Sequence, residues 1–201
     1  KNILLRLINR IKRTIYYGEE FEFPDFVFSV KQNLPLIQKT GRKWNKRKVK
    51  KFFNLNYINE LPEKFIYFPL QLYPEASIHI PSPFFKHQER VIDLIRLSLP
   101  IDYKLIVKEH PLMEGRRSQK FYKALSRKSG VRLINTEVDS NQIIRRSSLT
   151  ISVSGTAVLE AYLLKKPSFS IGETTFSNFT NTIKVDLNDM EKTISCYINK
   201  K

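Results

Sequence analysis

The sequence has a single cysteine, Cys196, among its 201 residues. One thiol cannot form an internal disulfide, and it cannot supply a multi-cysteine zinc site. A reducing, cytoplasmic setting is therefore our expectation. Long apolar runs are missing as well: no stretch approaches the roughly 20 residues that span a bilayer, and residues 1–17 lack the apolar block and cleavage site of a signal peptide. We expect a soluble protein, with peripheral contact at the inner face of the membrane as the alternative.

The motifs of several common enzyme classes are also absent. The sequence contains neither a G-x-G-x-x-G fingerprint nor a G-x-x-x-x-G-K-[ST] loop, which argues against NAD and against P-loop nucleotide hydrolysis. It has no G-x-S-x-G nucleophile elbow. No spacing of histidine, cysteine and carboxylate residues supports a metal site. We therefore expect no metal and no cofactor.

Positive charge, by contrast, is abundant. The formal net charge is +16, and residues 1–60 hold fourteen Lys or Arg against five acidic residues, a net of +9. Residues 42–51, RKWNKRKVKK, have seven basic side chains in ten. Such an excess implies an anionic partner: nucleic acid, an acidic membrane surface, or phosphorylated and acidic sugars. A solvated helix face in a lysine-rich sequence explains the basic run equally well.

The N-terminal part of the chain differs in pattern from the remainder. Residues 2–17 place apolar side chains at helical spacing with basic residues between them, which predicts an amphipathic helix that packs on another domain or lies on an anionic membrane. Residues 18–41, with alternating phenylalanines and two prolines, predict an extended segment, and residues 42–54 predict a short basic helix. We therefore predict a basic arm or linker over residues 1–64 and a main domain over residues 65–201.

In the main domain, short apolar segments alternate with helix-length segments. This alternation predicts an α/β domain with a Rossmann-like parallel sheet and helices on both faces. The expected strands are Phe65–Leu70, Tyr103–Lys108, Val131–Ile134, Leu149–Val153 and Ser168–Ile171. The expected helices are Phe84–Leu99, Ser118–Lys128, Ser140–Arg146, Thr156–Lys165 and Asn188–Asn199.

Ligands of such sheets bind beyond the carboxyl ends of the strands, so the loops that follow the strands are the candidate site. His110 comes almost directly after the second expected strand, and Pro111 favours an extended backbone that would aim the imidazole into the crevice. A histidine there can donate a hydrogen bond to a phosphate oxygen or protonate a leaving phosphate. The loops singled out in this way are residues 71–77, 109–111, 154–156 and 172–174.

The turn Ser154-Gly155-Thr156 lies between a strand and a helix. Serine and threonine favour helix N-caps, glycine permits close backbone approach, and free N–H groups at a helix start attract anions. The turn therefore predicts a phosphate site, although helices also begin with such residues to satisfy their own backbone. Glu160 lies one turn into the helix on the face of Thr156. Its carboxylate can accept hydrogen bonds from ribose hydroxyls or favour the positive end of the helix.

Three stretches resemble the bacterial capsule polysaccharide biosynthesis proteins, a family that includes Kdo-transferring capsule enzymes. They are IYFPLQLYPEAS, SLPIDYKLIVKEHPLMEGRR and VRLINTEVDSNQIIRRSSLTISVSGTAVLEAYLLKKPSFSIG, and the resemblance covers residues 65–181. It implies a GT-B glycosyltransferase with two Rossmann-like domains and a nucleotide-sugar between them. This chain resembles the C-terminal, donor-binding domain. Residues 1–64 contain no complete N-terminal Rossmann domain, so the acceptor site and a catalytic carboxylate would belong to a missing N-terminal domain.

The resemblance also implies roles for individual residues. His110, the predicted catalytic residue, and Pro111 match the His-Pro motif that contacts the donor phosphate, and Ser154, Gly155 and Thr156 match a serine-containing turn. The remaining predicted substrate-binding residues are Gln71, Glu75 and Ser77, which match a loop near the donor, and Lys108, Glu109 and Glu160.

The implied partners are a nucleotide-sugar, CMP-linked rather than UDP-linked, and a lipid-linked or polysaccharide acceptor. Two alternatives stay open. One is a non-catalytic module that binds nucleic acid or an anionic membrane, although no nucleic-acid motif is present. The other is a polyol-phosphate transferase of similar fold.

Overall fold

The computed structural model describes residues 41–72, 88–153, 156–172 and 189–198. Its contacts divide the chain into two compact units. The first, here called the basic unit, comprises Lys1–Phe52 and Met113–Ala124, and the second, the sheet unit, comprises Phe53–Leu112 and Leu125–Lys201. The boundary that we placed after residue 64 stays a prediction. The segments predicted over residues 2–17 and 18–40 lie outside the described residues.

The sheet unit contains a five-stranded parallel sheet with the strand order β3-β2-β1-β4-β5. The first strand is therefore central: the chain adds β2 and β3 on one side of it and then β4 and β5 on the other. This reversal makes a topological switch point between β1 and β4. The strands are β1 (Phe65–Pro69), β2 (Lys104–Lys108), β3 (Val131–Ile134), β4 (Leu149–Ser152) and β5 (Ser168–Ser170).

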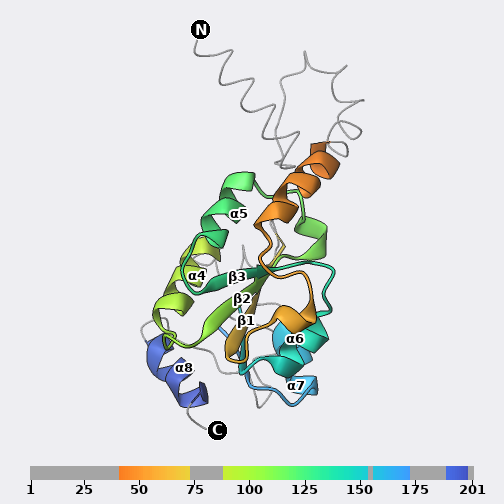
Figure 1. Cartoon of the computed structure of the whole chain (residues 1–201). Helices are drawn as coiled ribbons and strands as arrows, with labels where there is room; N and C mark the ends of the chain where they lie inside the picture. The colour runs from red at the N-terminus through yellow and green to blue at the C-terminus, as the bar shows by residue number, and fades with distance from the viewer. Residues whose placement is uncertain (1–40, 73–87, 154–155, 173–188, 199–201) are drawn as a thin grey trace, which may run out of the picture. The chain divides into compact units, whose positions relative to one another are not determined.

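Helices cover both faces of this sheet, which confirms the predicted Rossmann-like α/β fold. In Figure 1, α6 (Ser140–Arg146) and α7 (Ala157–Leu163) lie on one side, and α4 (Gln88–Leu97) and α8 (Met190–Ile198) lie on the other. Burial on both faces explains why β1 reads FIYFP without polar alternation. The other helical segments are η2 (Lys50–Phe52), η3 (Ile58–Glu60), η5 (Pro111–Met113) and α5 (Gln119–Ser126).

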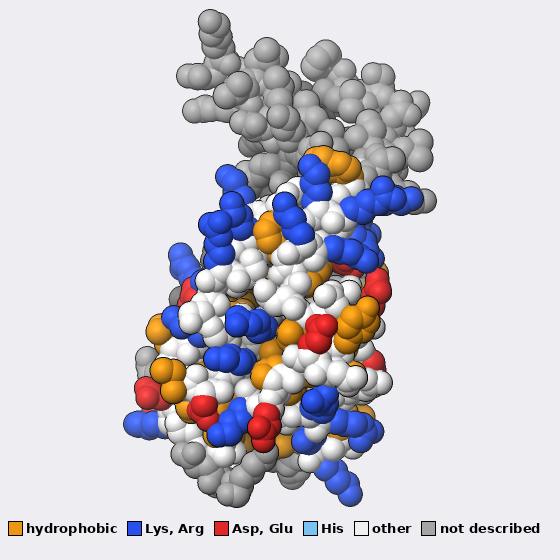
Figure 2. Space-filling view, viewed as in Figure 1, with side chains coloured by type: hydrophobic (Ala, Val, Ile, Leu, Met, Phe, Trp, Pro, Cys, Tyr) orange, Lys and Arg blue, Asp and Glu red, His pale blue; other side chains and the backbone are white. Residues whose placement is uncertain are grey.

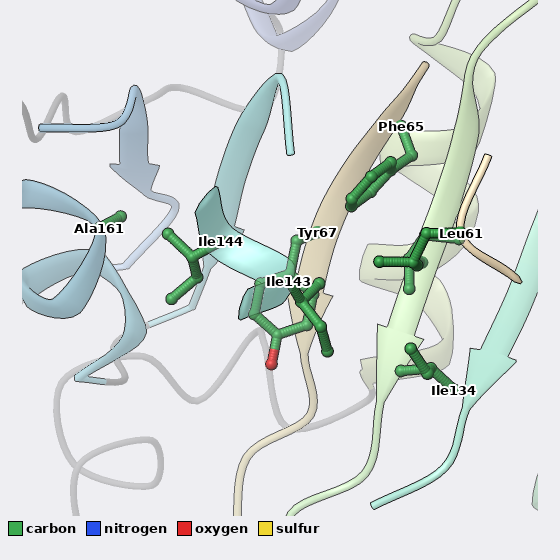
Figure 3. Packing of buried hydrophobic residues seen from close by; sticks show 8 residues of the cluster. Leu61, Phe65, Tyr67, Ile134, Ile143, Ile144 and Ala161 are labelled. Atoms are coloured by element: carbon green, nitrogen blue, oxygen red, sulfur yellow. The ribbon is translucent and has the colours of Figure 1, made fainter. Parts of the chain in front are cut away.

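A hydrophobic cluster holds α6 and α7 against the sheet. Figure 3 shows Ile143 and Ile144 of α6 beside Tyr67 of β1, with Ala161 of α7 nearby. The complete cluster also includes Leu61, Phe65, Ile106 and Ile134. Burying an isoleucine, leucine or phenylalanine side chain contributes about 1.5–3 kcal/mol to the stability of the fold. The cluster therefore fixes where the first residues of α6 and α7 lie, and these residues belong to the site described below.

The basic unit contains the predicted short basic helix, observed over residues 41–49 and continued by η2. The side-chain amide of Asn45 donates to the backbone oxygens of Gly115 and Arg117, each at 2.9 Å. The Nζ atom of Lys46 lies 2.9 Å from Oε2 of the buried Glu114. These contacts join two segments that are far apart in the sequence. Among the described residues, no helix has the length and hydropathy needed to cross a membrane.

Candidate functional site

A pocket of about 330 Å³ lies in the sheet unit, at the carboxyl ends of β1, β2 and β4. This is the switch point of the strand order, where ligands of doubly wound sheets bind. Its lining combines apolar and polar side chains from four parts of the sheet unit. The lining residues are Tyr67, Pro69, Leu70, Gln71, Leu72, Lys108, Glu109, His110, Pro111, Ser140, Ser152, Thr156, Ala157 and Glu160.

His110 is half-buried in this lining, and the backbone fixes the role of each ring nitrogen. The backbone N–H of Leu112 donates to Nδ1 of His110 at 3.2 Å. An acceptor nitrogen carries no proton, so the neutral ring holds its proton on Nε2. Beside it, Oε1 of the buried Glu109 accepts the backbone N–H of His110 at 2.8 Å. The loop thus presents Nε2–H of His110 as a hydrogen-bond donor.

Lys108 brings a cation into the pocket from the end of β2. Only 6% of the residue is exposed, and its Nζ donates to the backbone oxygen of Val138 at 2.5 Å and to Oγ of Ser140 at 2.8 Å. Burial lowers the pKa of Lys108, while the carboxylates of Asp139 and Glu160 act to raise it. Two fixed acceptors leave the third ammonium proton for a ligand.

Tyr67 and Gln71 are the buried polar residues on the β1 side of the pocket. The phenol of Tyr67 donates to Oγ of Ser140 at 3.4 Å, and burial raises the pKa of that phenol well above its ordinary value. The side-chain Nε2 of Gln71 donates to Oγ of Ser152 at 3.0 Å, and its backbone N–H donates to Oε1 of Gln88 at 2.9 Å. These bonds hold the end of β1 against β4 and α4.

Thr156 and Glu160 form the α7 side of the pocket. The hydroxyl of Thr156 donates to Oε1 of Glu160 at 3.1 Å and makes no capping bond to the helix backbone. The backbone of Thr156 is already helical, with φ −62°. The two side chains therefore lie on one helix face, as predicted. Both contribute oxygen atoms to the lining of the pocket.

The structure thus brings together seven of the residues that the sequence singled out. These are Gln71, Lys108, Glu109, His110, Pro111, Thr156 and Glu160. The other four, Glu75, Ser77, Ser154 and Gly155, lie outside the described residues. A shared pocket does not test binding, so the functional role of each residue stays a prediction.

Sequence reasoning missed Tyr67, Ser140 and Ser152. Ser140 follows the loop after the third strand, which is not among the four candidate loops, and Asp139 before it is a recognisable N-cap. Tyr67 and Ser152 lie within strands, where a buried polar atom cannot be told from core by pattern alone. Among the described residues, no group of three or more His, Cys, Asp or Glu could hold a metal ion.

Comparison with solved structures gives several similar folds. The UDP-GlcNAc 2-epimerase of Methanocaldococcus jannaschii is 17% identical, with a TM-score of 0.53 over 84% of this chain and 47% of that one. The same enzyme in complex with UDP-GlcNAc and UDP is 16% identical, with a TM-score of 0.50 over 80% and 46%. The KpsC beta Kdo 2,7 transferase of Thermosulfurimonas dismutans is 17% identical, with a TM-score of 0.48 over 85% and 52%.

The chain therefore spans about half the length of these solved structures. At such identities the likeness concerns the fold alone. None of the curated proteins compared with the chain matches it. The profile of one family, described as capsule polysaccharide biosynthesis protein, matches residues 6–191. Because this match extends over most of the sequence, the chain belongs to the capsule polysaccharide biosynthesis protein family.

Proposed function

We propose that this chain forms the donor nucleotide-sugar-binding domain of a glycosyltransferase that acts in capsule or surface polysaccharide biosynthesis. The observation that carries the proposal is the pocket at the switch point, lined by His110, Lys108 and Glu160. Its volume of about 330 Å³ falls within the range of small-molecule sites. An epimerase of similar fold, solved with UDP-GlcNAc and UDP, supports a nucleotide-sugar as the ligand class.

The pocket wall carries polar groups that suit the phosphate and the ribose of such a donor. Nζ of Lys108 and Nε2–H of His110 are donors suited to phosphate oxygens. The carboxylate of Glu160 is suited to ribose hydroxyls, which donate to it. The CMP-linked sugar that the resemblance implies is the donor that we propose.

In the reaction that we propose, the acceptor hydroxyl attacks the anomeric carbon of the donor sugar. The bond between that carbon and the phosphate oxygen breaks, and the phosphate leaves with the electron pair. His110 Nε2–H stabilises the charge that develops on the leaving oxygen and can transfer its proton there. The proton of the acceptor hydroxyl passes to a carboxylate that we expect on a second domain, since two-domain enzymes of this type close around the donor.

Nucleotide binding tests the proposal directly. We expect CMP to raise the thermal unfolding midpoint of the full chain, because a ligand that binds only the folded state stabilises that state. The rise with CMP should exceed the rise with UDP, and CDP is the third nucleotide in the comparison. Isothermal titration would give the dissociation constants. The absence of any response to all three nucleotides at millimolar concentration would overturn the assignment.

Variants of His110 test which ring atom acts. We expect His110→Ala to weaken CMP binding at least about tenfold, equivalent to roughly 1.4 kcal/mol. His110→Gln places an amide N–H near the position of Nε2 and should retain more binding than His110→Asn, which can only replace Nδ1 as the acceptor for Leu112. Arg127→Ala, an exposed change outside the pocket, is the control. Equal binding by the Gln and Asn variants would remove the role assigned to Nε2.

A further inference from the structure

The charged side chains in the described part of the basic unit are almost exclusively cationic. Residues 41–52 and 113–124 contain eleven Lys or Arg side chains and one acidic residue, Glu114. Only 1% of Glu114 is exposed, so no carboxylate of these segments reaches the surface. Figure 2 shows blue Lys and Arg side chains crowded over this part of the molecule. The exposed cations are Lys43, Arg47, Lys48, Lys50, Lys51, Arg116, Lys120 and Lys123.

The fold keeps these charges close together although they repel one another. Asn45 and Lys46 bond to the backbone of Gly115 and to Glu114, which fixes the two basic segments side by side. Burial and the neighbouring charge of Arg116 lower the pKa of Arg42. Crowded like charges attract an anionic partner, and contact with an anionic surface would reduce their mutual repulsion.

Aromatic rings lie among the cations, and three of them have a cation over the ring. Nζ of Lys48 lies 3.3 Å from the ring centroid of Trp44, Nζ of Lys51 lies 5.2 Å from that of Phe52, and Arg117 covers Phe121 at 4.9 Å. Trp44 is nevertheless 47% exposed. The surface therefore offers indole and ammonium groups together, which is the combination that suits the headgroup region of a membrane.

From this charge and these rings we infer that the basic unit docks on a membrane surface rich in anionic phospholipid, with Trp44 entering the headgroup layer. Nucleic acid is the competing polyanion. Proteins that bind single strands stack bases on open aromatic faces, whereas Nζ of Lys48 occupies one face of the Trp44 ring. The inference concerns a different surface from the pocket and holds whether or not the pocket binds a nucleotide-sugar.

Trp44 provides the readout, because it is the only tryptophan in the sequence. The full chain would be mixed with phosphatidylcholine vesicles, with or without about one third phosphatidylglycerol. We expect the Trp44 emission to shift to shorter wavelength, and the chain to co-sediment, only with the anionic vesicles. Both effects should weaken at high salt, because the Debye length falls to about 3 Å at 1 M.

A matched pair of triple variants separates local charge from total charge. Lys43→Gln, Arg47→Gln and Lys120→Gln together remove three exposed cations of the basic unit, and we expect about a hundredfold weaker vesicle binding, at about fivefold for each. Arg90→Gln, Arg127→Gln and Arg145→Gln remove three exposed cations of the sheet unit and should change binding by less than about fivefold.

Three results would overturn the inference. One is equal binding to neutral and anionic vesicles, and another is an equal loss for the two triple variants. The third is binding to a single-stranded RNA, with loss in the basic-unit variant, while anionic vesicles leave the Trp44 emission unchanged. That result would assign the surface to nucleic acid instead.

Discussion

Tyr67 places an ionisable phenol in the interior of the sheet unit, with only 1% of the residue exposed. Burial raises its pKa, and the carboxylates of Glu160 and Asp139 act in the same direction, while the hydrogen bond to Ser140 acts against them. The folded protein therefore keeps this proton when the unfolded chain, with the ordinary pKa of 10.0, loses it. The stability that Tyr67 contributes is complete below pH 10 and is lost as the pH rises above it.

The change Tyr67→Phe isolates this effect. At neutral pH we expect the variant to be at most about 1 kcal/mol less stable, since it loses one long hydrogen bond. At about pH 11 the wild type should have lost roughly 1.4 kcal/mol relative to the variant, which has no proton to lose at this position. Urea unfolding of both proteins at the two pH values measures the difference. A stability gap that is the same at both would contradict the assigned pKa direction.

For single residues, position along a strand was enough to predict where a side chain lies, while its functional role stays a prediction. Lys108 and His110 were placed at the pocket because they end or follow a strand, and the pocket contains both. The acceptor role of His110 Nδ1 could not be predicted, because it depends on the turn that brings Leu112 N–H to the ring. Likewise, the network of Lys108, Ser140 and Tyr67 joins residues from three elements. No local pattern encodes their contact.

At the level of elements, the N-cap of α6 links helix stability to the pocket. The two carboxylate oxygens of Asp139 accept the backbone N–H groups of Asn141 and Gln142, each at 3.3 Å. The residues on either side of this cap, Val138 and Ser140, hold the ammonium of Lys108. The start of α6 therefore positions the cation of the pocket.

Replacing the cap tests this link. We expect Asp139→Ala to lower the free energy of unfolding by about 1 kcal/mol, within a range of 0.5–2 kcal/mol. Asp139→Asn retains an acceptor oxygen and should lose only a few tenths, so it serves as the matched control. Urea unfolding gives both values. Equal losses in the two variants would mean that charge, and not the capping bond, stabilises the helix start.

The order of elements was predictable because apolar segments and helical spacing are local properties. The third strand and α6 agree with the predicted bounds. Small differences at the ends are found for β1, β2, β4, β5, α5 and α7. The strand order was not predictable, because it depends on which strands meet across long connections. The same holds for residues 113–124, which join the basic helix through Asn45 and Gly115.

On the scale of the whole molecule, the two units offer two surfaces with separate chemistry. The pocket and its lining belong to the sheet unit, and the crowded cations belong to the basic unit. Each unit contains a glycine with positive φ: Gly115 in the basic unit, at 80°, and Gly130 in the sheet unit, at 78°. Only glycine adopts such angles without strain, and another residue there costs about 1–2 kcal/mol. The two positions therefore allow each unit to be weakened separately.

The surroundings of these glycines differ. A Cβ atom at Gly115 would lie 2.7 Å from the backbone oxygen of Arg42 and 3.0 Å from Lys46, so the chain itself would have to move. At Gly130 the nearest atom would be 4.0 Å away, on the flexible side chain of Arg96. We expect Gly115→Ala to cost about 1–3 kcal/mol more than Gly130→Ala, because overpacking adds to the strain that both share.

Two measurements show which unit loses stability in each glycine variant. Trp44 fluorescence follows unfolding of the basic unit, and CMP titration follows the pocket if the proposed function holds. We expect Gly115→Ala to lower the denaturant midpoint seen by Trp44 and to weaken binding to anionic vesicles, with little change in CMP affinity. For Gly130→Ala the midpoint seen by Trp44 should change less, because this glycine lies in the other unit. If both variants instead shift both readouts together, the two units unfold as one cooperative structure, and membrane docking and donor binding are then coupled through stability rather than separable by mutation.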